Sequence, residues 1–115
     1  RRCISDCLDA LKTSAGAVVA IPCAATIKRA TAGLMIAETI SREQLWLAQT
    51  PQGFHRAAGL AAFAAAAREG FDGTDDAQVL ERCGLAVALV TGDARNLKLT
   101  TPEDLALAIA LLRAG

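Results

Sequence analysis

The chain has 115 residues, of which 12 are basic and 12 are acidic, so its formal net charge is zero at neutral pH. This length fits one domain better than two. The balanced charge gives no broad positive surface for nucleic acid or a membrane, and no apolar run reaches the about 20 residues of a membrane span. Hydrophobic residues make up 53% of the chain and aromatic residues only 3%. From this composition we expect a core of Ala, Leu, Val and Ile. From the balanced charge and the short apolar runs we expect no nucleic-acid partner and no membrane.

The cysteines and the first residues bear on location and completeness. The four cysteines show no paired C-x-x-C spacing; they are Cys3, Cys7, Cys23 and Cys83. We expect four small buried thiols in a reducing cytosol rather than a zinc or redox site, and hence a cytoplasmic protein. The chain opens on Arg1 inside a helical pattern, without Met, so we expect it to be a piece of a longer protein.

The first part of the chain predicts a helix, a strand and a hairpin. Four apolar residues follow the spacing of a helical face, namely Ile4, Cys7, Leu8 and Leu11. Residues 16–22, GAVVAIP, form a short apolar run between Gly and Pro, which is typical of a strand buried on both faces of a parallel sheet. Residues 23–42 contain two β-prone stretches around Thr31, Ala32 and Gly33, which predicts a hairpin.

The hairpin is more apolar than an exposed ribbon should be. Its apolar residues are Ile27, Leu34, Met35, Ile36 and Ile40. A two-stranded ribbon is marginal by itself in water. We therefore expect a projecting arm that packs on a second subunit.

The middle of the chain predicts a strand and two helices. Residues 45–49 read as a short strand with a turn at 50–53, and residues 55–69 as an Ala-rich helix that ends at Gly70. Its expected apolar stripe is Leu60, Phe63 and Ala67. Thr74 or Asp75 is the expected cap of the next helix, which stops at Gly84.

The last part of the chain predicts two strands and a capped helix. Residues 85–90 are a second apolar strand, and residues 96–99 a short one. Thr101 is the expected cap of the final helix, with Pro102 at its first position. Because strands alternate with helices, the fold class is α/β.

Four blocks in order resemble one family: IPCAATIKR, ETISREQLWLAQTPQGF, TDDAQVLERCG and GDARNLKLTTPEDLALA. Over nearly all its length the chain is similar to the C-terminal half of 2-C-methyl-D-erythritol 4-phosphate cytidylyltransferases. The resemblance implies the C-terminal part of a Rossmann-like nucleotidyltransferase three-layer fold. Residues 1–115 would then be the C-terminal portion of a single domain, with a β-hairpin arm at about 23–42 and the N-terminal nucleotide-binding half absent.

The resemblance also implies a reaction. The family transfers a cytidylyl group from CTP to 2-C-methyl-D-erythritol 4-phosphate, giving 4-diphosphocytidyl-2-C-methyl-D-erythritol and diphosphate in isoprenoid biosynthesis. It implies a homodimer formed through the arm, with CTP and a polyol phosphate as binding partners and Mg²⁺ as cofactor. The family's Gly-rich nucleotide loop and Mg²⁺ ligands fall upstream of residue 1, so we expect no metal or cofactor ligand in this chain and no activity from the 115 residues alone.

Four site residues are carried over from the family. Thr26 and Arg42 stand at the arm positions that reach the substrate site of the partner subunit, and a guanidinium suits a phosphate because it offers a planar fork of donors. Thr50 is the substrate-contacting threonine in Gln-Thr-Pro-Gln. Lys98 matches the lysine near the reacting phosphates and is the expected catalytic residue.

Two departures from the family pattern leave alternatives open. Ala25 and Ser41 stand where the family commonly has Asp, beside the substrate residues of the arm. These departures leave open a cytidylyltransferase for another polyol phosphate, such as ribitol 5-phosphate. The absence of the expected N-terminal half leaves open a non-catalytic dimerisation module. A downstream fusion to a cyclase is equally open.

Two other polar features receive ordinary explanations. His55 has no nearby nucleophile or second ligand and is expected at a helix start on the surface or in packing. Asp75 and Asp76 are expected to favour the helix dipole rather than to hold a metal.

Overall fold

A three-stranded sheet forms the centre of the computed structural model, which describes residues 1–115. The strands lie in the order β4 (Trp46–Phe54), β1 (Gly16–Pro22) and β5 (Val87–Thr91). The central β1 runs parallel to β5 and antiparallel to β4. Its observed bounds are the predicted ones, and its first five residues are buried, as expected for a strand that is covered on both faces.

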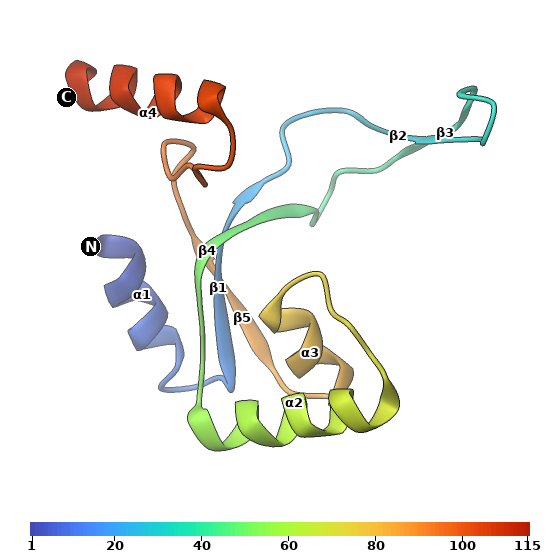
Figure 1. The fold of residues 1–115 in the computed structure, drawn as a ribbon, viewed down its shortest axis with the longest axis vertical. Helices are drawn as coiled ribbons and strands as arrows, with labels where there is room; N and C mark the ends of the chain where they lie inside the picture. The colour runs from blue at the N-terminus through green and yellow to red at the C-terminus, as the bar shows by residue number, and fades with distance from the viewer.

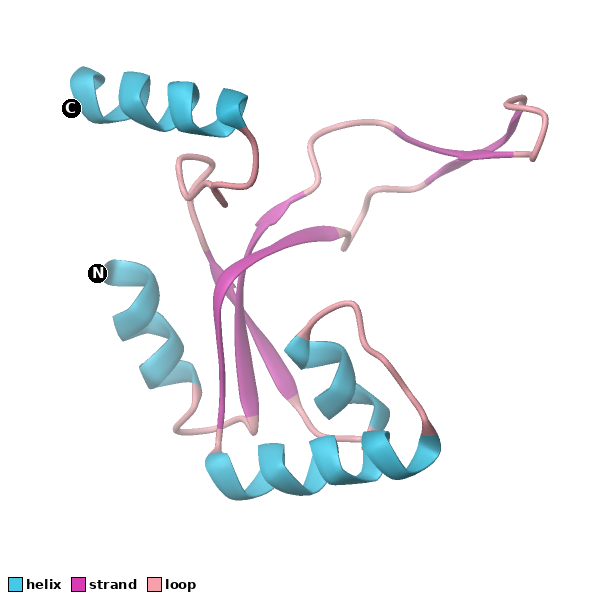
Figure 2. Ribbon diagram, viewed as in Figure 1, coloured by secondary structure: helices cyan, strands magenta, loops and turns pink.

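Helices cover both faces of the sheet, so the chain is a three-layer α/β structure (Figures 1 and 2). The helix α1 (Arg2–Ala10) packs on one face, where Cys7 contacts a cluster that includes Ala17 and Val19 of β1. The opposite face is covered by α3 (Asp76–Arg82), against which α2 (Arg56–Glu69) packs. The expected α/β layering is confirmed.

The buried face of α1 differs from the predicted one. Cys7 is buried, and Cys3 and Leu11 pack around it. Ile4 and Leu8 were expected on the same face, but they are 58% and 61% exposed. The helix therefore turns its small sulfur-bearing residues toward the sheet and leaves two larger apolar side chains outside.

The predicted stripe of α2 is also wrong. The residues that face the core are Gly59, Ala62 and Ala66, whereas Leu60 is 60% exposed and Phe63 is 37% exposed. Small side chains let the helix axis approach α3 closely, which larger residues at these positions would prevent. Both ends of α2 are as predicted, because His55 is the exposed N-cap and Gly70 adopts the left-handed conformation that ends helices.

The predicted hairpin within residues 23–42 is confirmed. The strands β2 (Ile27–Ala30) and β3 (Ile36–Ile40) pair only with each other, in a second sheet. In Figure 1 this ribbon projects away from the central sheet. At its tip Leu34, Met35 and Ile36 are 87%, 70% and 64% exposed. We call residues 23–42 the arm.

The C-terminal helices begin where their caps predict. Asp75 accepts from the backbone N–H of Gln78 and begins α3. Thr101 and Asp104 form a reciprocal capping box at the start of α4 (Pro102–Ala114). No helix of the chain is both long enough and apolar enough to cross a bilayer.

Two strand predictions in the C-terminal part need correction. The strand expected at 85–90 lies at Val87–Thr91. Residues 96–99 were expected to form a short strand, but they form no regular element. The segment runs as a loop whose backbone is held by side-chain hydrogen bonds, described below.

All four cysteines are free thiols. Cys7 and Cys23 are buried and Cys3 is half-buried, as expected for small core residues. Cys83 is exposed, so the expectation of four buried thiols is wrong for this residue. It ends α3 at the surface, directly before Gly84.

Candidate functional site

The strand β4 contains a large bulge at the Gln-Thr-Pro-Gln segment. Ala48 pairs with Ala20 of β1 and Gln52 pairs with Val18, so residues 49–51 lie opposite Val19 alone. The peptide bond between Thr50 and Pro51 is cis. The turn predicted at 50–53 is wrong, because the strand continues to Phe54 and takes up two extra residues within 49–51.

Side chains from three parts of the chain donate to the bulge. The Nδ2 of Asn96 donates to the carbonyl oxygen of Thr50 at 2.6 Å, and Nε2 of Gln52 donates to that of Gln49 at 3.4 Å. The Cys7 thiol of α1 lies 4.0 Å from the carbonyl oxygen of Pro51. Each bulge carbonyl thus has a side-chain donor, which fixes the position of Thr50 on the protein surface.

Thr50 and Lys98 line the same cavity, which has a volume of about 1000 Å³. It is lined by Ile21 near the C-terminal end of β1 and by residues that follow β5, among them Lys98. Ligands of open α/β sheets bind at this carboxyl end of the strands. The structure therefore brings together two of the four predicted site residues.

Lys98 is the only cation among the residues that line this cavity, which also include three aspartates, Asp75, Asp76 and Asp104. Two of these carboxylates are engaged in helix caps. Hydrogen bonds from Thr100 and Thr101 lower the pKa of Asp104 below its ordinary value. Asp75 accepts from Gln78 at 2.9 Å and from Gln52 at 3.1 Å. A bound polyanion would therefore need cations beyond those of this wall.

The other two predicted residues, Thr26 and Arg42, do not line this cavity. Both are exposed and lie where the arm joins the sheet. The guanidinium of Arg42 donates to the carbonyl oxygen of Ala24 at 2.7 Å, which ties the two sides of the arm base together. Within one chain these residues are separate from the Thr50 and Lys98 wall.

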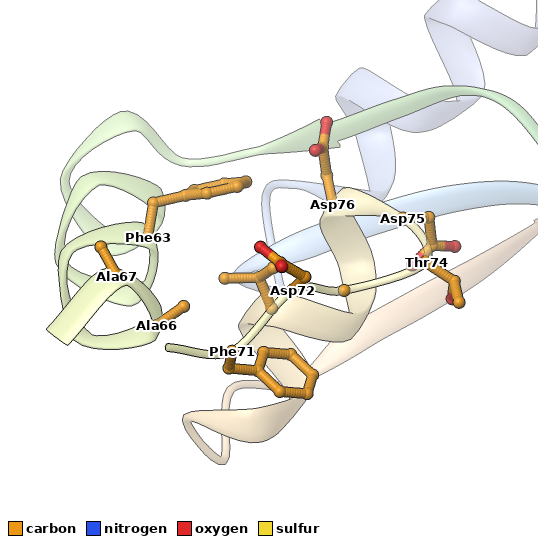
Figure 3. Close-up of a pocket in the computed structure, with 10 residues that line it drawn as sticks. Phe63, Ala66, Ala67, Phe71, Asp72, Thr74, Asp75 and Asp76 are labelled. Atoms are coloured by element: carbon orange, nitrogen blue, oxygen red, sulfur yellow. The ribbon is translucent and has the colours of Figure 1, made fainter. Parts of the chain in front are cut away.

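A second cavity, of about 430 Å³, lies between α2 and the start of α3. Figure 3 shows its walls, with Phe63 on α2, Phe71 and Asp72 on the connecting loop and Asp76 at the helix start. Asp76 also lines the first cavity. Asp75 is the N-cap of α3 and Asp76 lies in its first turn. No group of three or more His, Cys, Asp or Glu side chains in the chain could hold a metal ion.

Sequence reasoning missed three amide side chains, Gln49, Gln52 and Asn96. Gln52 joins β4 to α3, because its Oε1 accepts from the backbone N–H of Ala77 at 3.3 Å while its Nε2 donates to Asp75. All three residues are half-buried and line the large cavity. The one signal available, for Gln49 and Gln52 only, was the density of neutral hydrogen-bonding groups around Pro51, since amides can donate and accept at once.

The chain matches a known protein family over almost its whole length. The family model for 2-C-methyl-D-erythritol 4-phosphate cytidylyltransferase matches residues 1–114. A relative of that name from Geotalea uraniireducens is 53% identical over 98 residues, which is 85% of this chain and 42% of the relative. Another, from Bacillus licheniformis, is 46% identical over 114 residues, which is 99% of this chain and 49% of the relative.

A solved structure has the same fold. The crystal structure of 2-C-methyl-D-erythritol 4-phosphate cytidylyltransferase from Thermus thermophilus superimposes with a TM-score of 0.86 at 39% identity. It covers 98% of this chain, which corresponds to 55% of the Thermus chain. The chain thus spans about half the length of the relatives it matches. By the match of the family model over almost every residue, the chain belongs to the 2-C-methyl-D-erythritol 4-phosphate cytidylyltransferase family.

Proposed function

We propose that the chain is the C-terminal half of an enzyme that transfers a cytidylyl group from CTP to 2-C-methyl-D-erythritol 4-phosphate in isoprenoid biosynthesis. The products are 4-diphosphocytidyl-2-C-methyl-D-erythritol and diphosphate. The observation that carries the proposal is the shared cavity of Thr50 and Lys98 at the carboxyl end of the sheet. Membership of the family supports the choice of substrates.

The reaction needs placement of charge more than proton transfer. A phosphate oxygen of the polyol phosphate attacks the α-phosphorus of CTP, and the bond from that phosphorus to the bridging oxygen breaks, so that diphosphate leaves with the electron pair. Negative charge builds up on the leaving and equatorial oxygens. The ammonium of Lys98 offsets this charge, and the hydroxyl of Thr50 donates to the polyol phosphate.

The magnesium ion that the family resemblance implies does not fit the residues of this chain. The chain has no cluster of ligands for it, and two of the three carboxylates of the cavity wall, Asp75 and Asp104, are engaged in helix caps. We assign its ligands to residues beyond these 115, together with the nucleotide loop.

We also propose a cytoplasmic homodimer in which each arm serves the cavity of the other subunit. Three observations support this arrangement. The strands of the arm pair only with each other, its tip exposes Leu34 and Met35, and Arg42 does not line the cavity of its own chain, where Lys98 is the only cation. Arg42 and Thr26 of one subunit would then complete the anion site of its partner. Free thiols support a reducing compartment.

The proposal is tested on the complete enzyme with CTP and either 2-C-methyl-D-erythritol 4-phosphate or ribitol 5-phosphate. Diphosphate release and the ³¹P spectrum of the product identify the accepted alcohol. Lys98→Ala should lower kcat by about 100-fold or more, the cost of removing one electrostatic donor, with an unchanged unfolding curve. Lys12→Ala is the matched control, because Lys12 pairs with Asp9 on the surface of α1.

Each result has a definite meaning. Turnover of the Lys98→Ala variant at the wild-type rate would remove Lys98 from the reaction. Preference for ribitol 5-phosphate would reassign the substrate. A complete protein that dimerises but releases no diphosphate with either alcohol would favour the non-catalytic dimerisation module.

A further inference from the structure

We propose that Gln49 and Asn96 form a latch that positions Thr50 relative to Lys98 in the transfer reaction. Both are positioning residues, which act through the segments that they hold. The proposal rests on the function proposed above and adds two residues to it. Neither amide is among the site residues that the sequence indicated.

The latch joins two segments that are not neighbours in the sheet. The strand β4, which carries Gln49, and the strand β5, which leads to Asn96, lie on opposite sides of β1. The side chain of Gln49 crosses β1 beside Val19. Its Nε2 donates to the carbonyl oxygen of Asp93 at 3.0 Å and lies 3.4 Å from the carbonyl oxygen of Asn96. The carboxamide of Gln49 thus binds the backbone of the loop that follows β5.

Asn96 holds the same connection from the other side. Its Nδ2 donates to the carbonyl oxygen of Thr50 at 2.6 Å and lies 3.4 Å from Oε1 of Gln49. Its own backbone N–H donates to Asp93 at 2.9 Å. Because Lys98 follows only two residues later, the side chain that fixes Thr50 belongs to the segment that carries Lys98.

Gly92 leaves the space that the latch needs. Its backbone N–H donates to the carbonyl oxygen of Ala20 at 2.8 Å, which keeps the chain beside β1 after β5 ends. A Cβ at this position would overlap Oε1 of Gln49 and would lie 2.6 Å from Cγ1 of Val19. Val19 is fully buried, so it offers no room. Only a glycine lets the Gln49 side chain cross here.

The latch matters because the two segments that it joins form one wall of the cavity and carry its two expected contacts, Thr50 and Lys98. The predicted strand at 96–99 does not form, so no ladder of backbone hydrogen bonds fixes the loop. Side-chain amides take that part instead. A misplacement of about 1 Å between reacting groups can lower a rate about 100-fold, so loss of the latch should act mainly on kcat.

The test uses the complete enzyme with CTP and 2-C-methyl-D-erythritol 4-phosphate. Gln49→Glu keeps the length and one oxygen of the side chain but removes the amide donor, and Asn96→Asp does the same for Asn96. We expect each to lower kcat about 10- to 100-fold and to leave KM for CTP within about twofold of wild type. The double variant should be no slower than the slower single variant, since each change breaks the same connection.

A second comparison separates positioning from a general loss of stability. In a Lys98→Ala background, Gln49→Glu should reduce kcat by less than about threefold, because the group that it positions is already gone. Val79→Ala serves as the control for stability: Val79 is buried in the cluster between α2 and α3 and does not line the Thr50 and Lys98 cavity. It should lower Tm without lowering kcat.

The possible failures are distinct. If the wild-type enzyme forms no product, the proposed function fails. If the wild type is active and Gln49→Glu and Asn96→Asp retain its kcat, the latch is wrong while the function stands. A decrease in kcat caused by Gln49→Glu that is as large in the Lys98→Ala background as in wild type would also overturn the positioning role. So would losses of kcat that occur only together with a lower Tm, because these would indicate a structural role.

Discussion

Gly59 of α2 lies against the ring of Phe54 so closely that a side chain on the glycine would overlap the ring carbons. Phe54 ends β4, and Gly59 lies in the first turns of the helix that follows it. The phenyl ring also packs at 5.8 Å from that of Phe63. The contact therefore fixes the angle between the strand that carries the site and the helix behind it.

Gly59→Ala should destabilise the protein, although alanine is the better helix former. The overlap with Phe54 costs about 1–3 kcal/mol by overpacking, against a propensity gain of at most about 1 kcal/mol. We expect a lower free energy of unfolding in urea titrations. Ala64→Val adds carbon to the exposed side of the same helix and should change stability by less than about 0.7 kcal/mol. A more stable Gly59→Ala variant would show that the ring moves freely.

The tip of the arm should carry the dimer. Leu34 has a positive φ of 61°, so Leu34→Asn keeps a residue that tolerates this backbone, and Met35→Ser removes the neighbouring apolar side chain. Burial of such a side chain is worth about 1.5–3 kcal/mol, so the double variant should weaken dimerisation at least tenfold in sedimentation experiments. Met35→Leu conserves volume and should leave the dimer intact. A dimer unaffected by the double variant would place the interface elsewhere.

The start of α4 should loosen in acid. Hydrogen bonds from Thr100 and Thr101 lower the pKa of Asp104 in the folded chain. Its unfolded pKa is about 3.9, so its stabilising effect is complete above that pH and is lost as pH falls through the lower folded value. Amide chemical shifts of residues 100–104 should report this transition. Asp104→Asn should abolish it, whereas Glu103→Gln should retain it.

The cap can also be weakened at neutral pH. Thr101→Ala removes the hydroxyl that accepts from the backbone N–H of Asp104 at 3.1 Å, and loss of such a cap costs about 1 kcal/mol. Hydrogen exchange at the first turn of α4 should accelerate accordingly. Exchange rates equal to those of wild type would mean that the Asp104 carboxylate holds the helix start alone.

The cysteines should differ widely in reactivity. Burial raises the pKa of the Cys7 thiol, and the nearby Cys3 and Asp6 add to the shift, so Cys7 remains protonated and shielded. Cys83 is exposed. Iodoacetamide at pH 8 should label Cys83 first, as followed by peptide mass spectrometry, while Cys7 and Cys23 react only after denaturation. Equal labelling of Cys7 and Cys83 in the native protein would contradict the packing of α1.

The sequence predicted the features that local interactions determine, and it failed for features that depend on tertiary packing. The helix start at Thr101 and the buried strand at 16–22 depend on local hydrogen bonding and on an unbroken apolar run, so both were predicted correctly. The buried face of α2 depends on how closely α3 approaches, which hydrophobicity does not encode. Gly59, Ala62 and Ala66 of α2 therefore face the core, and Leu60 is exposed.

The site was predictable in part for a similar reason. Thr50 and Lys98 were identified through family resemblance, and the structure brings them to one cavity. The segment at 96–99 is a loop instead of the expected strand. Gln49 holds it from across β1, and Asn96, within the segment, donates to Thr50. Such long-range amide contacts leave no periodic pattern in a sequence.

The bulge in β4 has one further consequence, which concerns the phase of the strand. Two more residues lie on β4 than on β1 between the pairs Ala48–Ala20 and Gln52–Val18. Because side chains alternate with a period of two, an even insertion leaves both halves of the strand in step, whereas an odd one would exchange their faces. Phe54 accordingly still packs against Gly59 of α2, while Thr50 is exposed. A two-residue bulge can thus expose a site residue while the flanking parts of the strand keep the same faces toward the core.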